Sequence, residues 1–88
     1  MPARTLMIGR HSDCNIVLRD ETVSRFHAEL VITEEGRYFL VDRNSMRGTW
    51  RAVDGSWLRL KHSEYVNPDD RIKFGEVETK LRDVASGA

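Results

Sequence analysis

The chain has 88 residues, with 14 Lys or Arg against 14 Asp or Glu, so its formal net charge is zero. A chain of this length forms one small domain with a modest core. The balanced charge gives no general attraction to nucleic acid or to an anionic membrane, so any recognition of anions must be local. Cys14 is the only cysteine, which excludes an intramolecular disulfide.

No part of the sequence has the features of a membrane or secretory segment. No segment approaches the roughly 20 apolar residues that a membrane-spanning helix needs. The N-terminal residues lack the apolar region of a signal peptide. We therefore expect a cytoplasmic protein without membrane association. Because there is no internal repeat or linker, we expect a single domain over residues 1–84 and a flexible tail over residues 85–88.

Short apolar or alternating segments, each bounded by turn residues, follow one another along the whole chain. No window shows a helical period over three turns. Strands are expected over residues 5–8, 15–18, 26–33, 37–42, 49–53, 57–61, 71–74 and 76–84. Many short strands at this spacing indicate an all-β fold, either a sandwich or a small barrel.

Local turn chemistry predicts which of these strands pair. Asp54-Gly55 lies between two strand-like segments and is a strong signal for a two-residue hairpin. The turn Glu34-Glu35-Gly36 predicts a second hairpin, between residues 26–33 and 37–42. Asn67-Pro68-Asp69-Asp70 predicts a further turn, because proline fixes φ and Asn and Asp bond to their own backbone.

Three polar loop segments carry residues suited to binding phosphate. They are Gly9-Arg10 after the first strand, Ser24-Arg25 before the third, and the loop over residues 42–49, which contains Arg43 and Arg47. Guanidinium groups offer planar pairs of donors that match phosphate oxygens, and a serine hydroxyl adds a short neutral donor. Because β-sandwiches gather their loops at two ends, these segments can meet in one site.

The order and spacing of these segments resemble the forkhead-associated (FHA) domain family. The resemblance rests on Gly9-Arg10, Ser24-x-x-His27 and Asp42-x-x-Ser45-x-x-Gly48-Thr49, and it covers roughly residues 4–83. It implies an FHA-type β-sandwich of two twisted, mainly antiparallel sheets with about eleven short strands and with the binding loops at one end. It also implies a module for phosphopeptide recognition in signal transduction, which binds phosphothreonine in a partner protein.

The resemblance assigns roles to individual residues. Arg10 and Ser24 would hold the phosphate, with Arg25 beside them. His27 would point inward and brace the loops rather than act in catalysis. The remaining motif residues would shape the loops; they are Gly9, Ser45, Gly48 and Thr49. The resemblance also implies that the protein is not an enzyme and needs no cofactor or metal. A Ser/Thr kinase would be needed to phosphorylate the partner.

Two positions depart from the family pattern. The family usually has Asn before Gly-Thr, an amide that can donate to and accept from the peptide backbone, whereas this chain has Arg47, which only donates. The preceding position often carries a hydroxyl and is Met46 here. Losing a hydrogen bond to a charged group costs about 1.5–3 kcal/mol. We therefore expect Met46 and Arg47 to alter peptide contacts, with Arg47 reaching the phosphate or an acidic flanking residue.

Two other binding functions compete with this interpretation. The first is phosphate-independent docking of a protein on the same fold, through a sheet edge or face, which Met46 and Arg47 motivate. The second is binding of single-stranded nucleic acid, which combines a basic groove with aromatic platforms. Trp50 and Trp57, with nearby arginines, supply both ingredients, but the zero net charge argues against nucleic acid as a partner.

Two chemical sites find little support. Cys14, His27 and Asp42 could form a thiol nucleophile, a base and an orienting group, but no helix N-terminus is expected near Cys14 to lower its pKa. His11-x-x-Cys14 has the spacing of half a zinc site, and no second pair follows it, since His62 is isolated. We expect neither catalysis nor metal binding.

Overall fold

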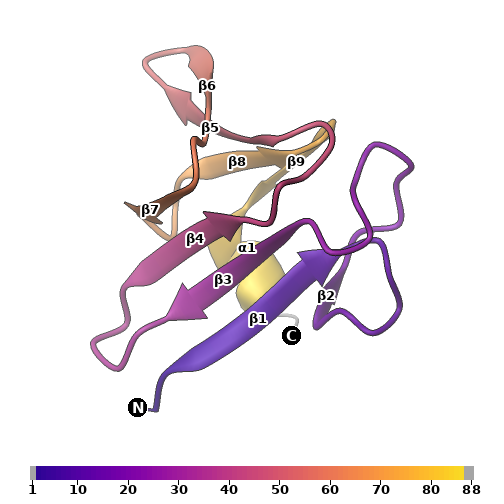
Figure 1. The fold of residues 1–88 in the computed structure, drawn as a ribbon. Coiled ribbons are helices and arrows are strands. Elements are labelled where there is room, and N and C mark those ends of the chain that lie inside the picture. The colour runs from indigo at the N-terminus through magenta and orange to yellow at the C-terminus, as the bar shows by residue number, and fades with distance from the viewer. Residues whose placement is uncertain (1, 87–88) are drawn as a thin grey trace.

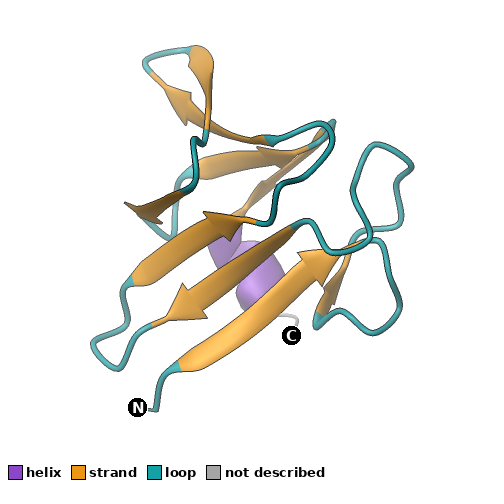
Figure 2. Cartoon of the chain, viewed as in Figure 1, coloured by secondary structure: helices purple, strands orange, loops and turns teal. Residues whose placement is uncertain are grey.

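A computed structural model describes residues 2–86, which form strands and one short helix. The elements are β1 (Arg4–Gly9), β2 (Ile16–Val17), β3 (Ala28–Ile32), β4 (Tyr38–Asp42), β5 (Thr49–Val53), β6 (Ser56–Arg59), β7 (Ser63–Val66), β8 (Arg71–Phe74), β9 (Val77–Lys80) and α1 (Leu81–Ser86). The expected all-β sandwich is confirmed, although the described residues hold nine strands rather than about eleven. Figure 2 shows how little of the chain is helical.

The strands form two open sheets. One has five strands in the order β2-β1-β3-β4-β7, and the other has four in the order β6-β5-β8-β9. The β1–β2 pair is parallel and the other pairs are antiparallel, so the sheets are mainly antiparallel as expected. Within residues 2–86 the sheets do not close into a barrel, which decides between the two β architectures that the sequence left open.

Alternating residues of both sheets build one core. In β3, Ala28 and Leu30 are buried while Glu29 and Val31 are only partly covered, as the alternation in the sequence predicts. In β8 of the second sheet, Ile72 and Phe74 are likewise buried in the core. The core cluster consists of Leu6, Ile8, Ile16, Val23, Ala28, Leu30, Leu40, Leu60, Val66, Ile72, Phe74, Leu81 and Ala85.

The predicted hairpins form at the expected turns. Asp54 and Gly55 have positive φ values of 50° and 81°, as a two-residue turn matched to the strand twist requires. The β3–β4 pair turns at Gly36, where φ is 83°. In the turn after β7, the Asp70 N–H donates to the Asn67 carbonyl oxygen.

The C-terminal region differs from the prediction. The expected strand over residues 76–84 ends at Lys80, and helix α1 follows directly. Leu81 and Ala85, four residues apart, bury their side chains in the core, and this packing stabilises the helical turn. Ala85 and Ser86 therefore belong to the helix rather than to a tail. Gly87 and Ala88, the rest of the expected tail, lie outside the described residues.

Strand register places the candidate loops together. Ile8 pairs with Ala28, and Ala28 pairs with Asp42, so β1 ends, β3 begins and β4 ends at one level of the sheet. The segments that follow or precede these residues all leave at the same end, which is on the right in Figure 1. Among the described residues, no helix is long and apolar enough to cross a membrane.

Candidate functional site

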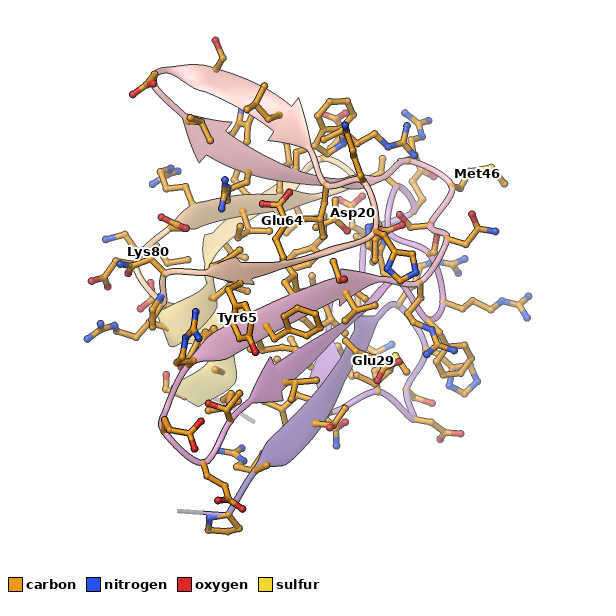
Figure 3. The ribbon with its side chains drawn as sticks, turned by 60° about the vertical axis from the view of Figure 1, so that its left-hand side comes forward. Asp20, Glu29, Met46, Glu64, Tyr65 and Lys80 are labelled. Carbon is orange, nitrogen blue, oxygen red and sulfur yellow. The ribbon has the colours of Figure 1, made fainter. Side chains whose placement is uncertain are left out.

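The loop end of the sandwich holds a cavity of about 260 Å³. It brings together the phosphate-binding and peptide-contacting residues that the resemblance implied, from segments far apart in the chain. The lining residues are Arg10, Glu21, Thr22, Val23, Ser24, Arg25, Met46 and Arg47. Met46 projects from the rim, and Figure 3 shows its side chain reaching out from the loop end of the molecule.

Arg10 is held in place by the segment on which Ser24 lies. Its Nε–H donates to the carbonyl oxygen of Val23 at 3.0 Å, and its backbone N–H donates to the Ser24 carbonyl oxygen, also at 3.0 Å. The two terminal nitrogens of the guanidinium make no hydrogen bond to any other described residue. One edge of Arg10 is therefore fixed, and the other is free to donate to a ligand.

Ser24 joins this segment to the loop after β4. Its Oγ accepts a hydrogen bond from the backbone N–H of Met46 at 3.0 Å, across 22 residues of sequence. Because the hydroxyl oxygen acts here as an acceptor, its own hydrogen stays available for donation. The Ser24 hydroxyl can thus give a hydrogen bond to an anion in the cavity.

The backbone of Arg25 is fixed while its side chain is exposed. Its carbonyl oxygen accepts from the His11 N–H at 3.1 Å and from the Cys14 Sγ at 3.2 Å. Gly9 makes this approach possible, because a Cβ at Gly9 would lie 2.0 Å from the same carbonyl oxygen. Gly9 and Cys14 therefore fix the point from which the Arg25 side chain leaves the loop.

His27 is fully buried beneath the cavity and links two of its walls. The backbone N–H of Ser24 donates to its Nδ1 at 3.0 Å, and its Nε2 lies 2.9 Å from the Gly48 carbonyl oxygen. Since Nδ1 accepts, Nε2 carries the hydrogen and donates it to Gly48. Burial lowers the pKa of His27, although the Gly48 carbonyl and the charge of Asp42 oppose this shift. The ring is therefore neutral at neutral pH.

A buried network fixes the loop after β4. Asp42 accepts hydrogen bonds from the Ser45 hydroxyl at 2.6 Å and the Thr49 hydroxyl at 2.8 Å, and also from the Ser45 N–H. Burial opposes ionisation of Asp42, but the hydrogen bonds from Ser45 and Thr49 outweigh it and lower its pKa. Gly48 turns the chain at φ 86° between these partners. Ser45, Gly48 and Thr49 thus give the loop a defined shape.

Arg47 has a fixed backbone and an unpaired side chain. Its carbonyl oxygen accepts from the Trp50 indole N–H at 3.0 Å. None of the ion pairs among residues 2–86 involves its guanidinium, and the residue lines the cavity. Arg10, Arg25 and Arg47 line this cavity against a single acidic residue, Glu21. The local charge therefore favours an anion even though the whole chain is neutral.

Some contributors to the site were not identified from the sequence. Glu21, Thr22 and Val23 line the cavity, and Val23 supplies the carbonyl that holds Arg10. Their position directly before Ser24 was the only available signal. Asp42 was part of the sequence motif but was given no role in shaping the loop, and the structure shows it at the centre of the loop network with Ser45 and Thr49.

The structure argues against a thiol active site. Burial raises the pKa of Cys14, and its Sγ donates to a backbone carbonyl. Both ring nitrogens of His27 are engaged with Ser24 and Gly48, so the ring does not activate this thiol. Among residues 2–86 no group of three or more potential metal ligands comes together.

Two sheets with a shared core, and an arginine-lined cavity between loops at one end, define a β-sandwich with a site suited to an anion. The sequence matches the FHA domain family over residues 6–75, and the chain belongs to this family. The resemblance inferred from the motifs is confirmed.

Known proteins similar to this chain include regulators and solved FHA structures. The oxoglutarate dehydrogenase inhibitor of Corynebacterium glutamicum is 48% identical over 72 residues, covering 82% of this chain and 46% of the inhibitor. EmbR of Mycobacterium tuberculosis, solved in complex with a low affinity phosphopeptide, is 30% identical with a TM-score of 0.72, over 84% of this chain and 18% of EmbR. A structure from an analysis of phosphothreonine-dependent FHA domain interactions is 31% identical with a TM-score of 0.64, over 84% and 71% of the two chains. This chain spans less than half the length of the curated relatives that it matches.

Proposed function

We propose that this protein binds phosphothreonine in a partner protein and has no enzymatic activity of its own. The observation that carries the proposal is the convergence of Arg10, Ser24 and Arg25 on one cavity of about 260 Å³ at the loop end. A phosphorylated side chain brings nearly two negative charges and three strong acceptors. In this cavity, the guanidinium groups of Arg10 and Arg25 and the hydroxyl of Ser24 can donate to those acceptors.

The proposed mechanism is charge-assisted hydrogen bonding from donors that are already in position. The free edge of the Arg10 guanidinium and the hydroxyl of Ser24 donate to one phosphoryl group, and the exposed Arg25 side chain adds a further cation beside it. Because His27 and the Asp42 network hold the loops before any ligand arrives, binding loses little conformational entropy.

Similarity to solved FHA domains favours phosphothreonine over other anions as the ligand. The 31% identical structure comes from an analysis of phosphothreonine-dependent interactions, and the 30% identical EmbR was solved with a phosphopeptide. The partner would then be the product of a Ser/Thr kinase in the same compartment, which we propose to be the cytoplasm. Neither a cofactor nor a metal enters this mechanism.

One observation favours a second function, phosphate-independent docking. The Met46 side chain is 88% exposed at the rim of the cavity, where it can make apolar contact with a protein that carries no phosphate. Nucleic-acid binding is less well supported, because Trp50 and Trp57 interact with Lys73 of their own sheet and Trp50 also with Arg59.

A degenerate phosphothreonine peptide library separates these functions. It is screened against the wild type and Arg10→Ala, with the unphosphorylated library as control. We expect enrichment of phosphopeptides by the wild type and loss of that enrichment in Arg10→Ala. Equal enrichment of both libraries would establish docking instead. Selection of single-stranded oligonucleotides with dependence on Trp57 rather than Arg10 would indicate nucleic-acid binding.

A further inference from the structure

A second groove borders the loop that carries Met46 and Arg47, and it shares no lining residue with the phosphate cavity. It consists of two adjoining cavities of about 500 Å³ each, which share Asp42, Asn44 and Lys61. The first is completed by Val41, Arg43 and His62, and the second by Ser45, Arg59 and Leu60. We call these two cavities together the basic groove, and none of the residues implied to bind phosphate lines it.

The charges in the basic groove do not cancel. The carboxylate of Asp42 already accepts three hydrogen bonds, two from Ser45 and one from Thr49. Arg43 is paired with Glu29. Among the described residues, no ion pair involves Arg59 or Lys61, and both side chains are exposed. Arg59 and Lys61 therefore outnumber the single carboxylate of Asp42, and the groove is positive overall.

Local packing keeps Arg59 beside the loop. Its guanidinium lies 5.6 Å from the ring centroid of Trp50, an attractive cation–π arrangement. It also lies close to Gly48, where an added Cβ would come within 2.7 Å of the Arg59 Nε. Leu60, the next residue, is buried and donates its N–H to the Thr49 carbonyl oxygen. Lys61 is the residue after Leu60, so its backbone position is fixed by this hydrogen bond.

The basic groove and the phosphate cavity are lined by neighbouring residues of one loop. Asn44 and Ser45 line the groove, whereas Met46 and Arg47 line the phosphate cavity. Ser45 and Met46 are adjacent in sequence, so the two linings meet at Cα atoms about 3.8 Å apart, and each further extended residue of a bound peptide spans about 3.5 Å. A peptide held in the phosphate cavity can therefore reach the groove a few residues away.

We propose that the basic groove, through Arg59 and Lys61, receives an anionic side chain of the same partner segment, a few residues from the phosphothreonine. The inference rests on the proposed phosphopeptide binding. The ligand of the basic groove is an oxyanion, either the carboxylate of Asp or Glu or a second phosphoryl group. Arg59 and Lys61 attract an anion, and they add affinity only when the anion lies at the spacing from the phosphothreonine that reaches the groove. The groove therefore selects peptides by sequence.

A set of synthetic peptides tests the proposal and distinguishes the two oxyanions. Each peptide carries one phosphothreonine. The flanks are alanine throughout, or contain three aspartates placed two to four residues before or after it, or a second phosphothreonine at the same spacings. Fluorescence polarisation with the wild type should show one of the two sides binding about three- to tenfold more tightly than the alanine peptide. The advantage should disappear at about 1 M salt, where charges are screened within about 3 Å.

Variants locate the effect. Lys61→Gln should remove at least half of the flanking advantage, and Arg59→Gln with Lys61→Gln should remove all of it except the part that Arg47 contributes, while the alanine peptide binds all three proteins equally. Lys80→Gln makes the same charge change on β9, on the opposite side of the molecule from Met46 in Figure 3, and should keep the advantage. Circular dichroism and thermal unfolding check that each variant is folded.

The outcomes separate this inference from the function on which it rests. If the alanine phosphopeptide binds with dependence on Arg10 but flanking anions add nothing, the basic groove proposal is wrong and the phosphate site stands. Equal losses in Lys61→Gln and Lys80→Gln would show a general charge effect and also overturn it. If no peptide binds but an oligodeoxythymidylate binds with dependence on Lys61, both proposals fail.

Discussion

His27 donates a hydrogen bond from Nε2 to the Gly48 carbonyl oxygen at 2.9 Å, across 21 residues of sequence. The same ring accepts from the Ser24 N–H, so one buried side chain joins the two loops that form the phosphate cavity. Removing the ring leaves the partly buried Ser24 N–H and the buried Gly48 carbonyl oxygen without partners, and each such loss costs about 1–3 kcal/mol. By joining the two loops, His27 holds the donors of the phosphate cavity in position before a ligand binds.

We therefore predict that His27→Ala lowers the free energy of unfolding by about 3 kcal/mol or more. Urea denaturation monitored by tryptophan fluorescence measures this change. His62→Ala is the matched control, because His62 is exposed and, among residues 2–86, its ring forms a hydrogen bond only with the Ser63 hydroxyl, at 3.4 Å. The control should change stability by less than about 0.5 kcal/mol. Similar small effects of both substitutions would contradict the bracing role of His27.

The same histidine should make stability depend on pH. Burial lowers the pKa of His27 below its ordinary value of about 6.5, so between the two pKa values the unfolded chain binds a proton that the folded protein does not. Stability is therefore complete above this range and falls as the pH is lowered through 6.5 toward the folded pKa. Denaturation series on the wild type and His27→Gln measure the slope. An equal slope in both proteins would assign it to other groups.

The parts of the fold that local chemistry determines were predictable from the sequence. The Asp54-Gly55 turn requires two residues with positive φ, and both residue types tolerate it, so the β5–β6 hairpin was evident. Strand β7 was missed because Ser63–Val66 is short, and its pairing with β4 is not visible in its own pattern. Residues 81–84 of helix α1 were taken for the end of a strand, because a helix of six residues is less than two turns long and too short to show a helical period.

The candidate site was predictable in its residue types but not in its connections. The order of the motifs indicated Arg10, Ser24 and the loop after β4, and the register of β1, β3 and β4 brings them together. The bond from the Met46 N–H to Ser24 is a backbone contact, so no side-chain pattern could reveal it. The basic groove depends on Lys61 and Asn44 meeting across 17 residues, which only the tertiary structure shows.

Gly9 should tolerate no side chain. A Cβ there would lie 2.0 Å from the Arg25 carbonyl oxygen, a backbone atom that moves only with the loop. We predict that Gly9→Ala destabilises the protein by at least about 2 kcal/mol and also weakens phosphopeptide binding by displacing Arg25. Gly36→Ala is the control, since it meets open space and adds only the strain of φ 83°, about 1 kcal/mol. Chemical denaturation and peptide affinity should rank the two variants in this order, and the opposite rank would contradict the argument.

Arg47→Asn should change peptide selection rather than fold. The Arg47 backbone is held by Trp50, and its side chain makes no ion pair among residues 2–86, so stability should change by less than about 0.5 kcal/mol. An amide can both donate to and accept from a peptide backbone, and it loses the attraction of a cation for acidic residues. We expect weaker selection of acidic flanking residues in a peptide library. Unchanged selection would remove Arg47 from the specificity determinants.

The most direct test compares one peptide with and without its phosphoryl group. Isothermal titration of the wild type with the phosphothreonine peptide, its threonine counterpart and its phosphoserine counterpart measures the contribution of the phosphoryl group and of the threonine methyl. We predict that removing the phosphoryl group weakens binding at least about a hundredfold, as expected for losing two charge-assisted hydrogen bonds, and that Arg10→Ala abolishes the difference. Equal affinity for the phosphorylated and unphosphorylated peptides would contradict the account.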